Sequence, residues 1–211
     1  LLGLAITWFL VVSLMLAMSW QLGKTMLHAT NVSHLRYEAT LLADEVTQQV
    51  VMRIQALERL RETIGSTEDP DWISYQLRQN DTLLAWFDGI VVANSEGVVV
   101  ADWPAVVGRV GLNTADLENF DMLRGSRRPY ASEPFVGRAS GVPIVLISVP
   151  RFTEQGDFDG FIGGVLKLDS GGLFRRLAKV RLGDSGFAGV ATASGKILYH
   201  PDSKRVNVAV P

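Results

Sequence analysis

The chain opens with an unbroken run of apolar residues. Residues 1–23 contain no charged side chain, and Lys24 is the first charge. As a helix this run would be about 33 Å long, against about 30 Å for the hydrocarbon core of a bilayer. The pattern predicts an N-terminal transmembrane helix over residues 1–23. A buried core helix and a secretory signal peptide are the alternatives, but a soluble helix would show a polar face, and no small-x-small cleavage site precedes Lys24.

The next forty residues carry a helical period. Residues 24–64 contain neither Pro nor Gly, so we predict a long stalk helix that ends at Gly65. Its apolar positions recur at steps of three, four or seven and are Leu35, Leu42, Val46, Val50, Ile54, Leu57 and Ile64. A helix this long needs a partner along its stripe. We expect it to pack on the following domain or to form a homodimer with a second copy.

Alternating strands and turns follow. The apolar runs 90–93 and 98–101 flank the turn residues Asn94–Gly97 and predict a hairpin. Cap-forming residues from Asn113 predict a short helix to about Leu123. The remaining apolar runs predict three strands over 130–138, 142–152 and 158–168. Together these elements predict an α+β fold, a five-stranded antiparallel sheet with helices packed on one side.

The hairpin pattern returns near the end of the chain. A short helix is expected from Leu173 to Arg181, and a second hairpin turns at Gly195, 98 residues after Gly97. The 29 residues from Gly183 to Pro211 cannot close another five-stranded sheet. We therefore divide the chain into residues 1–23, 24–64, a membrane-distal lobe over 65–181, and the truncated start of a similar, membrane-proximal lobe over 182–211. A chance similarity of the two hairpins is the alternative.

Composition excludes several classes of protein. The 211 residues include 20 basic and 22 acidic side chains, a formal net charge of −2, which argues against a nucleic-acid partner. The chain has no Cys, which excludes disulfides and thiolate zinc sites. At 47% hydrophobic residues it has enough apolar material for a core.

No catalytic motif in this sequence has all the residues that its chemistry requires. Residues 183–186 read Gly-Asp-Ser-Gly, like the nucleophile turn of trypsin-like proteases, but a nucleophilic Ser needs a His base and an orienting acid. His28 and His34 lie about 240° apart around a helix and cannot share a metal. His200 has no evident acid in register. We expect no enzyme activity, no cofactor and no metal in this segment.

Three stretches carry a family resemblance. Residues 128–134 read RPYASEP, residues 141–150 read GVPIVLISVP, and residues 160–166 read GFIGGVL. With the apolar opening and the long helix, their order resembles the extracytoplasmic double Cache sensor family, whose lobes look like PAS domains. The resemblance covers residues 24–211. It implies a bacterial inner-membrane protein whose globular part is periplasmic, and whose output domain follows this segment.

The resemblance also suggests where a ligand binds. Family members hold a small molecule between the sheet and the loops and helix that cover it, and Tyr130 and Ser132 match the strand pair that often faces the ligand. Members that bind amino acids carry an Arg and a Trp-Tyr pair in the covering helix, which residues 118–123 lack. The strand Asp that those members use for the amine is replaced here by Val165. An α-amino acid is therefore not the expected ligand.

Two cations offer an alternative ligand chemistry. Arg138 and Lys167 are candidates to pair with a carboxylate, through charge-assisted hydrogen bonds, and we expect Tyr130 and Arg138 to meet at one cavity. Further candidate ligand contacts are Ser148, Asp102 and Trp103. Each has a structural alternative: the cations as solvated surface charges, Tyr130 as part of the core, and Trp103 as the cover of a strand end.

These observations predict a ligand-sensing input module. The sequence around Tyr130 is most similar to the sensor domains of diguanylate cyclases. The alternative outputs are a sensor histidine kinase and a chemotaxis transducer. The expected partners are a small molecule, for which a carboxylate is the candidate, the membrane, and a second copy of the chain. The alternative is a structural or interaction module, which dimerises or binds a partner without any small ligand.

Overall fold

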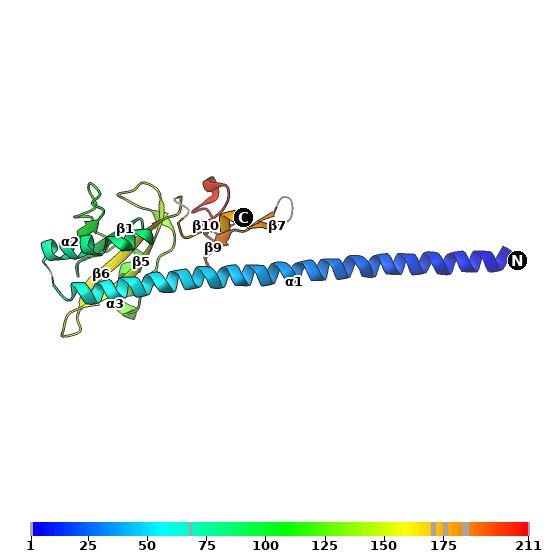
Figure 1. Cartoon of the computed structure of the whole chain (residues 1–211), viewed down its shortest axis with the longest axis horizontal. Coiled ribbons are helices and arrows are strands. Elements are labelled where there is room, and N and C mark those ends of the chain that lie inside the picture. Colours follow the sequence, from blue (N-terminus) through cyan, green and yellow to red (C-terminus); the bar gives the residue numbers. More distant parts are fainter. Residues whose placement is uncertain (1, 68, 170–171, 175–176, 183–185, 211) are drawn as a thin grey trace. The chain divides into compact units, whose positions relative to one another are not determined.

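The computed structural model describes residues 2–67, 69–169, 172–174, 177–182 and 186–210. The chain divides into two compact units, Leu1–Glu45 and Val46–Pro211, and each is considered by itself. Helix α1 (Leu2–Ile64) provides all of the described structure of the first unit and the beginning of the second (Figure 1).

The predicted membrane span falls within α1. The structure does not describe all of its side chains: those of residues 1–7, 10–11 and 23 lie outside the described part. Within the described residues, no helix combines the length and the apolar character that crossing a membrane requires.

The end of α1 agrees with the sequence prediction. Leu57 and Ile64 are buried, as the apolar stripe predicts, and Leu60, which is not part of that stripe, is buried as well. Gly65 follows with a φ of 72°, and its amide donates to the carbonyl of Arg61 at 2.9 Å. A left-handed residue at this place ends a helix, and Gly adopts that conformation without steric cost.

A second helix, α2 (Pro70–Gln79), and the 3₁₀ helix η1 (Asp81–Ala85) that follows it were not predicted from the sequence. The carboxylate of Asp69 accepts a hydrogen bond from the amide of Asp71 at 3.0 Å, so Asp69 is the N-cap and Pro70 is the first residue of the helix. Asp69-Pro70 signals the start of a helix, because the N–H of the first helical residue has no intrahelical partner and proline is therefore tolerated there.

Six strands form one antiparallel sheet, in the order β2-β1-β6-β5-β3, with β4 also paired to β5. The strands are β1 (Gly89–Ala93), β2 (Val99–Trp103), β3 (Tyr130–Ala131), β4 (Phe135–Val136), β5 (Pro143–Phe152) and β6 (Phe158–Lys167). The predicted hairpin is confirmed as β1 and β2. The predicted strand 130–138 is wrong, because it is broken into β3 and β4 around Pro134, which has no amide hydrogen to donate.

The covering helix also differs from its prediction. Helix α3 runs Glu118–Ser126 instead of starting at Asn113. Asn113 caps the amide of Ala115, and the hydroxyl and amide of Thr114 both donate to the carbonyl of Gly97. These cap-forming residues therefore fix a turn against the hairpin, and the helix begins after them.

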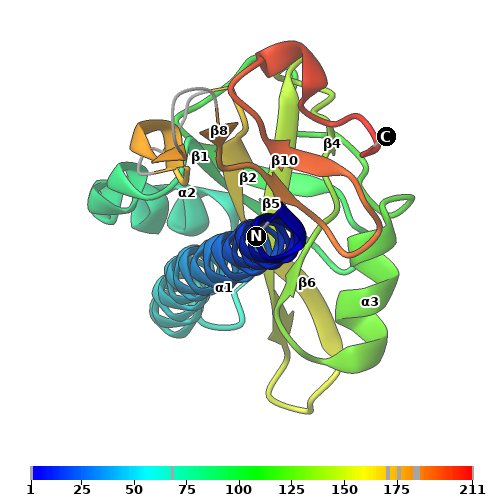
Figure 2. The same ribbon diagram turned by 90° about the vertical axis from the view of Figure 1, so that its right-hand side faces the viewer.

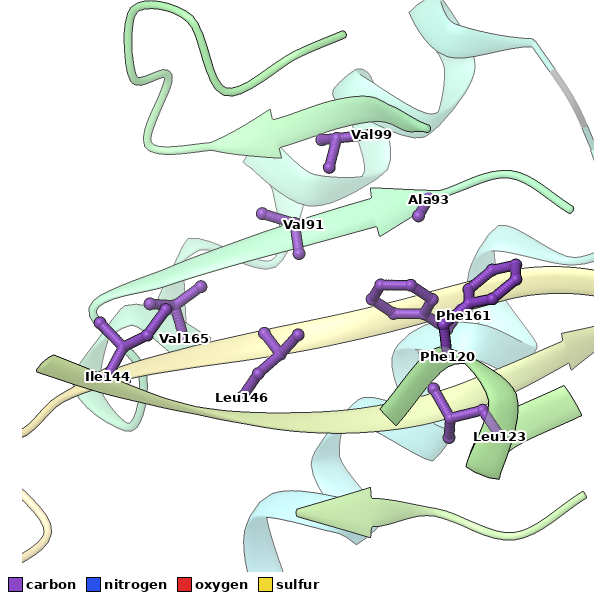
Figure 3. Packing of buried hydrophobic residues seen from close by; sticks show 9 residues of the cluster. All are labelled: Val91, Ala93, Val99, Phe120, Leu123, Ile144, Leu146, Phe161 and Val165. Atoms are coloured by element: carbon purple, nitrogen blue, oxygen red, sulfur yellow. The ribbon is translucent and has the colours of Figure 1, made fainter. Parts of the chain in front are cut away.

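Helices cover both faces of the sheet, so the prediction of helices on one side is wrong. Figure 2 shows α3 on one side of the sheet and α2, with the C-terminal turns of α1, on the other. One face packs with α3 in a cluster of buried apolar side chains (Figure 3): Val91, Ala93, Val99, Phe120, Leu123, Ile144, Leu146, Phe161 and Val165. Alternate strand residues such as Ile90, Val92 and Ile162 are buried toward the other helices.

Short elements follow the sheet: η2 (Leu177–Lys179), β7 (Arg181–Leu182), β8 (Gly186–Phe187), β9 (Val190–Ala191), β10 (Ile197–Tyr199) and η3 (Ser203–Arg205). The predicted helix 173–181 is therefore reduced to η2 before β7 pairs with β8, while residues 175–176 lie outside the described part. The Gly-Asp-Ser-Gly stretch falls largely on residues 183–185, which are outside it as well.

The second hairpin, β9 and β10, repeats the hydrogen bonds of the first. In β1–β2 the amide of Asn94 donates to Val98, and that of Gly97 to Asn94, each at 2.9 Å. Thr192 and Gly195 make the corresponding two bonds in β9–β10, at 2.8 and 2.9 Å. Both glycines have positive φ, 81° and 85°. The similarity seen in the sequence therefore extends to the turn geometry.

Candidate functional site

The strand register brings four of the predicted site residues to one face of the sheet. Tyr130 pairs with Ser148, Asp102 with Val91, and Lys167 with Ile144. Because Val91 and Ile144 belong to the cluster under α3, the side chains of Tyr130, Ser148, Asp102 and Lys167 belong to that face too.

Trp103 lies on the opposite face. It pairs with Ile90, the neighbour of Val91, and the guanidinium of Arg78 from α2 lies 5.8 Å from its ring centroid. The structure thus places Trp103 under α2, away from the face that carries the other candidates.

Two adjacent cavities open on the α3 face. The first, which we call the apolar cavity, has a volume of about 70 Å³. Its floor is made by strand side chains, and its walls by the loops around residues 109–117 and 135–140. The floor residues are Val91, Val99, Ile144, Leu146 and Val165. Since a water needs roughly 10–15 Å³, a group of a few heavy atoms fits.

The second, which we call the polar cavity, has a volume of about 140 Å³. It lies between the start of α3, the segment that joins β3 to β4, and the turn before β10. Its lining consists of Leu117, Glu118, Asn119, Tyr130, Ser132, Glu133, Pro134, Phe135 and Lys196. Leu117 and Phe135 also line the apolar cavity, so they form a wall common to the two.

The expected meeting of Tyr130 and Arg138 does not occur. Tyr130 lines the polar cavity, whereas Arg138 lines the apolar one. Tyr130 and Ser132 do come together, as the family resemblance implies, and Ser148 lies behind them.

A short polar network supports the floor of the polar cavity. Asn119, only 2% exposed, donates from Nδ2 to the hydroxyl oxygen of the fully buried Ser148, at 3.3 Å. The hydroxyl oxygen of Ser132 accepts from the amide of Leu146 at 3.0 Å. Buried polar groups satisfied in this way hold fixed positions. The network therefore presents Asn119 and Ser132 to the cavity in a defined arrangement.

The polar cavity has a negative electrostatic environment. Partial burial, followed by the charges of Glu118 and Glu133, raises the pKa of Tyr130 above its ordinary value. Desolvation and nearby negative charge both disfavour the phenolate. Tyr130 is therefore a neutral hydrogen-bonding group at physiological pH.

Glu133 connects the polar cavity to the second hairpin. Its Oε2 accepts hydrogen bonds from the hydroxyls of Thr192 and Ser194, both at 2.8 Å. Thr192 and Ser194 belong to the turn between β9 and β10, which also brings Lys196 to the rim of the cavity. The site is thus built from two parts of the chain about sixty residues apart.

The guanidinium groups at the apolar cavity are both paired. Arg138 donates to the carbonyl of Asn113 at 2.7 Å and forms an ion pair with Asp116, which raises the pKa of Arg138 and lowers that of Asp116. Arg109 pairs with Asp102 at 3.4 Å, with both side chains buried. Burial lowers the pKa of Arg109, and the charge of Asp102 acts in the opposite direction. Asp102 is thus a partner of Arg109.

Lys167 lies at the end of β6, and its amide donates to the carboxylate of Asp88 at 2.7 Å. It is not among the residues that line either cavity. The carboxylate ligand suggested by Arg138 and Lys167 stays a prediction, and the positions of these two residues do not add to it.

Sequence reasoning missed Asn119, Glu133 and Lys196. Asn119 sits next to Phe120 on the buried side of α3, and a polar residue on the apolar side of an amphipathic helix is a signal that was available. Lys196 and the partners of Glu133 become visible only once the second hairpin is placed beside β3. Within the described residues, no group of His, Cys, Asp and Glu side chains is arranged to hold a metal.

No family model and no curated protein matches the chain. Solved structures do match it. The ligand-binding domain of the Pseudomonas fluorescens chemoreceptor CtaA in complex with L-serine has a TM-score of 0.71 at 24% identity, covering 84% of this chain and 75% of that one. That of Pseudomonas aeruginosa PAO1 PctB in complex with L-Gln has 0.69 at 21%, covering 83% and 71%.

A third match is the ligand-binding domain of the amino acid chemoreceptor PctC from Pseudomonas aeruginosa PAO1 in complex with GABA. Its TM-score is 0.65 at 24% identity, and the match covers 81% of this chain and 76% of that one. At these identities the likeness establishes the fold. The chain has the mixed helix and antiparallel-sheet fold of chemoreceptor ligand-binding domains, as the resemblance to Cache sensors implies.

Proposed function

We propose that this chain is the extracytoplasmic ligand-sensing input module of a membrane-anchored bacterial signalling protein. The observation that carries the proposal is the polar cavity on the α3 face, where Tyr130, Ser132 and Asn119 meet on a sensor fold. Such a module catalyses nothing. Its ligand acts by binding one arrangement of the lobe and helix more tightly than another.

The organisation of the chain enters the proposal as well. Residues 1–23 are the anchor, the rest of α1 is a stalk through which two copies dimerise, and residues 182–211 open a second, membrane-proximal lobe. The repeated turn bonds at Asn94 and Thr192 support the second lobe. An uncharged 23-residue opening supports the anchor.

The output domain is the finer part of the proposal. The matched structures are chemoreceptor domains, and they favour a chemotaxis transducer at least as much as the diguanylate cyclase suggested by the residues around Tyr130. Their bound ligands, L-serine, L-Gln and GABA, are small polar molecules, and a ligand of similar size suits a cavity of about 140 Å³ here.

A thermal-shift screen of the full chain in detergent tests the proposal. The panel contains amino acids, amines, organic acids and purines. A ligand at one hundred times its Kd is expected to stabilise the fold by about 2.7 kcal/mol. Ser132→Ala and Tyr130→Phe should weaken the response, whereas Ser203→Ala, in the exposed η3, should not. A panel without any stabilising compound would contradict a sensor function.

A further inference from the structure

A third cavity, which we call the stalk-end cavity, lies at the C-terminal end of α1, beside the turn that joins β5 to β6. Its volume is about 380 Å³, larger than that of either cavity on the α3 face, and it shares no lining residue with them. Its polar lining consists of two guanidinium groups, two hydroxyls and one carboxylate: Arg61, Arg151, Ser66, Thr153 and Glu154. The sensor function proposed above does not use this cavity.

Arg61 brings unused hydrogen-bond donors to the stalk-end cavity. It belongs to the last turn of α1 and is partly buried. Its one side-chain hydrogen bond within the described chain runs from Nη1 to the carbonyl of Pro150, at 3.4 Å. No described carboxylate lies within ion-pair distance of it. A guanidinium has five N–H donors in a fork that fits an oxyanion, so most donors of Arg61 are available to a ligand.

Arg151 places the positive side of a buried ion pair in the wall of the cavity. Arg151 lines the cavity, whereas its partner Asp159 does not. The guanidinium of Arg151 also donates to the carbonyls of Gly65 and Thr67, at 3.4 and 2.7 Å. Carbonyls at the end of a helix repel an anion, and these two are already engaged by a cation. The wall is therefore compatible with a negatively charged ligand.

Two hydroxyl groups add donors to this wall. Oγ1 of Thr153 accepts a hydrogen bond from the amide of Asp157 at 3.1 Å, which leaves the hydroxyl hydrogen to be donated elsewhere. Ser66 is exposed, and its hydroxyl has no hydrogen bond with the described part of the chain. Phe152 supplies an aromatic wall, and the guanidinium of Arg127 lies 4.3 Å from its ring centroid, which brings another positive charge close to the cavity.

Glu154 opposes an anion. It is the one carboxylate among the lining residues, and it is exposed on the turn between β5 and β6. Water and salt screen an exposed charge more strongly than a partly buried one. Arg61 is partly buried and Arg151 is only 2% exposed, so the two guanidinium groups dominate the electrostatics inside the cavity. Glu154 therefore lowers the affinity for an anion without preventing its binding.

We propose that the stalk-end cavity binds a small molecule through an oxyanion, a carboxylate or a phosphate, with Arg61 as its main charge partner. The guanidinium of Arg61 and the hydroxyls of Ser66 and Thr153 donate to the oxyanion through charge-assisted hydrogen bonds. Because Arg61 belongs to α1 and Thr153 to the turn after β5, the bound anion links the stalk helix to the sheet. This inference goes beyond the proposed function, because it gives the module a second input, separate from the cavities under α3.

Isothermal titration of the full chain in detergent at pH 7 tests the inference with succinate, inorganic phosphate and succinamide. Succinamide has the shape of succinate without its charge. The tighter of the two anions is expected to bind at least tenfold more tightly than succinamide, and the order of succinate and phosphate tells which oxyanion the cavity prefers. Neither anion binding, or succinamide binding as tightly as the better anion, would overturn the inference and leave the sensor function standing.

Variants locate the bound anion. Arg61→Gln is expected to weaken binding of the tighter anion about tenfold or more, whereas Arg59→Gln, exposed two positions earlier on α1, leaves it unchanged. Glu154→Gln is expected to strengthen binding about threefold, because it removes the opposing charge. Ser66→Ala, at an exposed residue, is expected to weaken binding about threefold and keeps the test valid if Arg61→Gln impairs folding.

The polar cavity supplies the counter-test. Tyr130→Phe is expected to leave anion binding unchanged, since Tyr130 does not line the stalk-end cavity. Anion binding that is lost in Tyr130→Phe, or that is the same as in wild type in both Glu154→Gln and Ser66→Ala, would place the anion elsewhere and overturn the inference.

Discussion

At the scale of single residues, most charged groups near the two cavities form ion pairs with one another. Asp102 and Arg109 form a buried pair, while Asp116 and Arg138 form an exposed one. Exposed pairs contribute little to stability, but they fix the position of a side chain. The pair at Asp116 thus holds the guanidinium of Arg138 beside the loop that walls the apolar cavity.

This exposed pair predicts a pH dependence. Because hydrogen bonding to Arg138 lowers the pKa of Asp116, the stabilisation is complete above the ordinary carboxyl pKa of about 3.9 and is lost as the pH falls below it. Asp116→Asn should therefore lower the melting temperature slightly at pH 7, and the difference from wild type should shrink at pH 3. Asp157→Asn, an exposed carboxylate in a turn, is the control. A difference that grows on acidification would contradict the prediction.

The sequence located part of the site at this scale. Tyr130 and Ser132 were found because a motif carries them together on one short segment. Asn119 and Glu133 were not, since a polar residue faces a cavity only through the packing of distant segments. The partner of Arg138 lies 22 positions away and could not be inferred from spacing.

At the scale of elements, a buried ion pair attaches the end of α1 to the sheet. Arg151 on β5 and Asp159 on β6 lie 2.8 Å apart, at 3% and 4% side-chain exposure. The guanidinium of Arg151 also donates to the carbonyls of Gly65 and Thr67, at 3.4 and 2.7 Å. The residues after the last turn of the stalk are thereby bound to two central strands.

Removing one member of this pair should be costly. We expect Asp159→Asn to destabilise the lobe by roughly 3–5 kcal/mol, because it removes the carboxylate charge from a buried ion pair. Asp157→Asn, two positions earlier and exposed, should change stability by less than about 0.5 kcal/mol. Urea denaturation of the two variants measures the difference. Equal midpoints would show that the pair contributes no net stability.

The junction of β1 and β6 depends on one glycine. Gly160 has a φ of 90°, and a Cβ there would lie 2.0 Å from the carbonyl oxygen of Ala93. Gly160→Ala should therefore cost at least about 2 kcal/mol. Gly125→Ala, in α3 with open space around it, should be neutral or stabilise by up to about 1 kcal/mol. Thermal melting distinguishes the two, and a Gly160→Ala protein with unchanged melting would contradict the strain argument.

The sequence predicted the elements whose signals are local. The hairpin followed from its turn residues, and the end of α1 from Gly65. Helix α2 was not predicted, although Asp69-Pro70 is a signal for the start of a helix. The break between β3 and β4 depends on Pro134, and the covering of both sheet faces depends on packing that no single segment reveals.

At the scale of the whole molecule, the same hairpin geometry occurs twice. The turns at Gly97 and Gly195 share their bonds and their positive φ, although their flanking residues differ. Repetition at this level supports a chain built from two related lobes. The hydroxyls of the second turn bind Glu133, so the second hairpin contacts the segment that joins β3 to β4.

The proposed dimer gives a prediction at this scale. Val46 is half-buried on the apolar stripe of α1, and its neighbour Thr47 is exposed. Val46→Asp should raise the dimer dissociation constant at least about tenfold, because a desolvated, unpaired carboxylate costs more than about 1.4 kcal/mol. Thr47→Asp should not. Sedimentation equilibrium of the full chain in detergent measures both, and identical constants would exclude pairing through this stripe.

Leu117 and Phe135 form a wall common to the apolar cavity and the polar cavity. This shared wall has a consequence for regulation. A ligand in one cavity that displaces either side chain changes the shape of the other cavity, even when the ligands of the two cavities do not contact each other. By thermodynamic reciprocity, whatever one ligand does to the affinity of the other is returned in equal measure. In the sensor function proposed above, ligands of the two cavities would therefore strengthen or weaken each other's binding within one lobe.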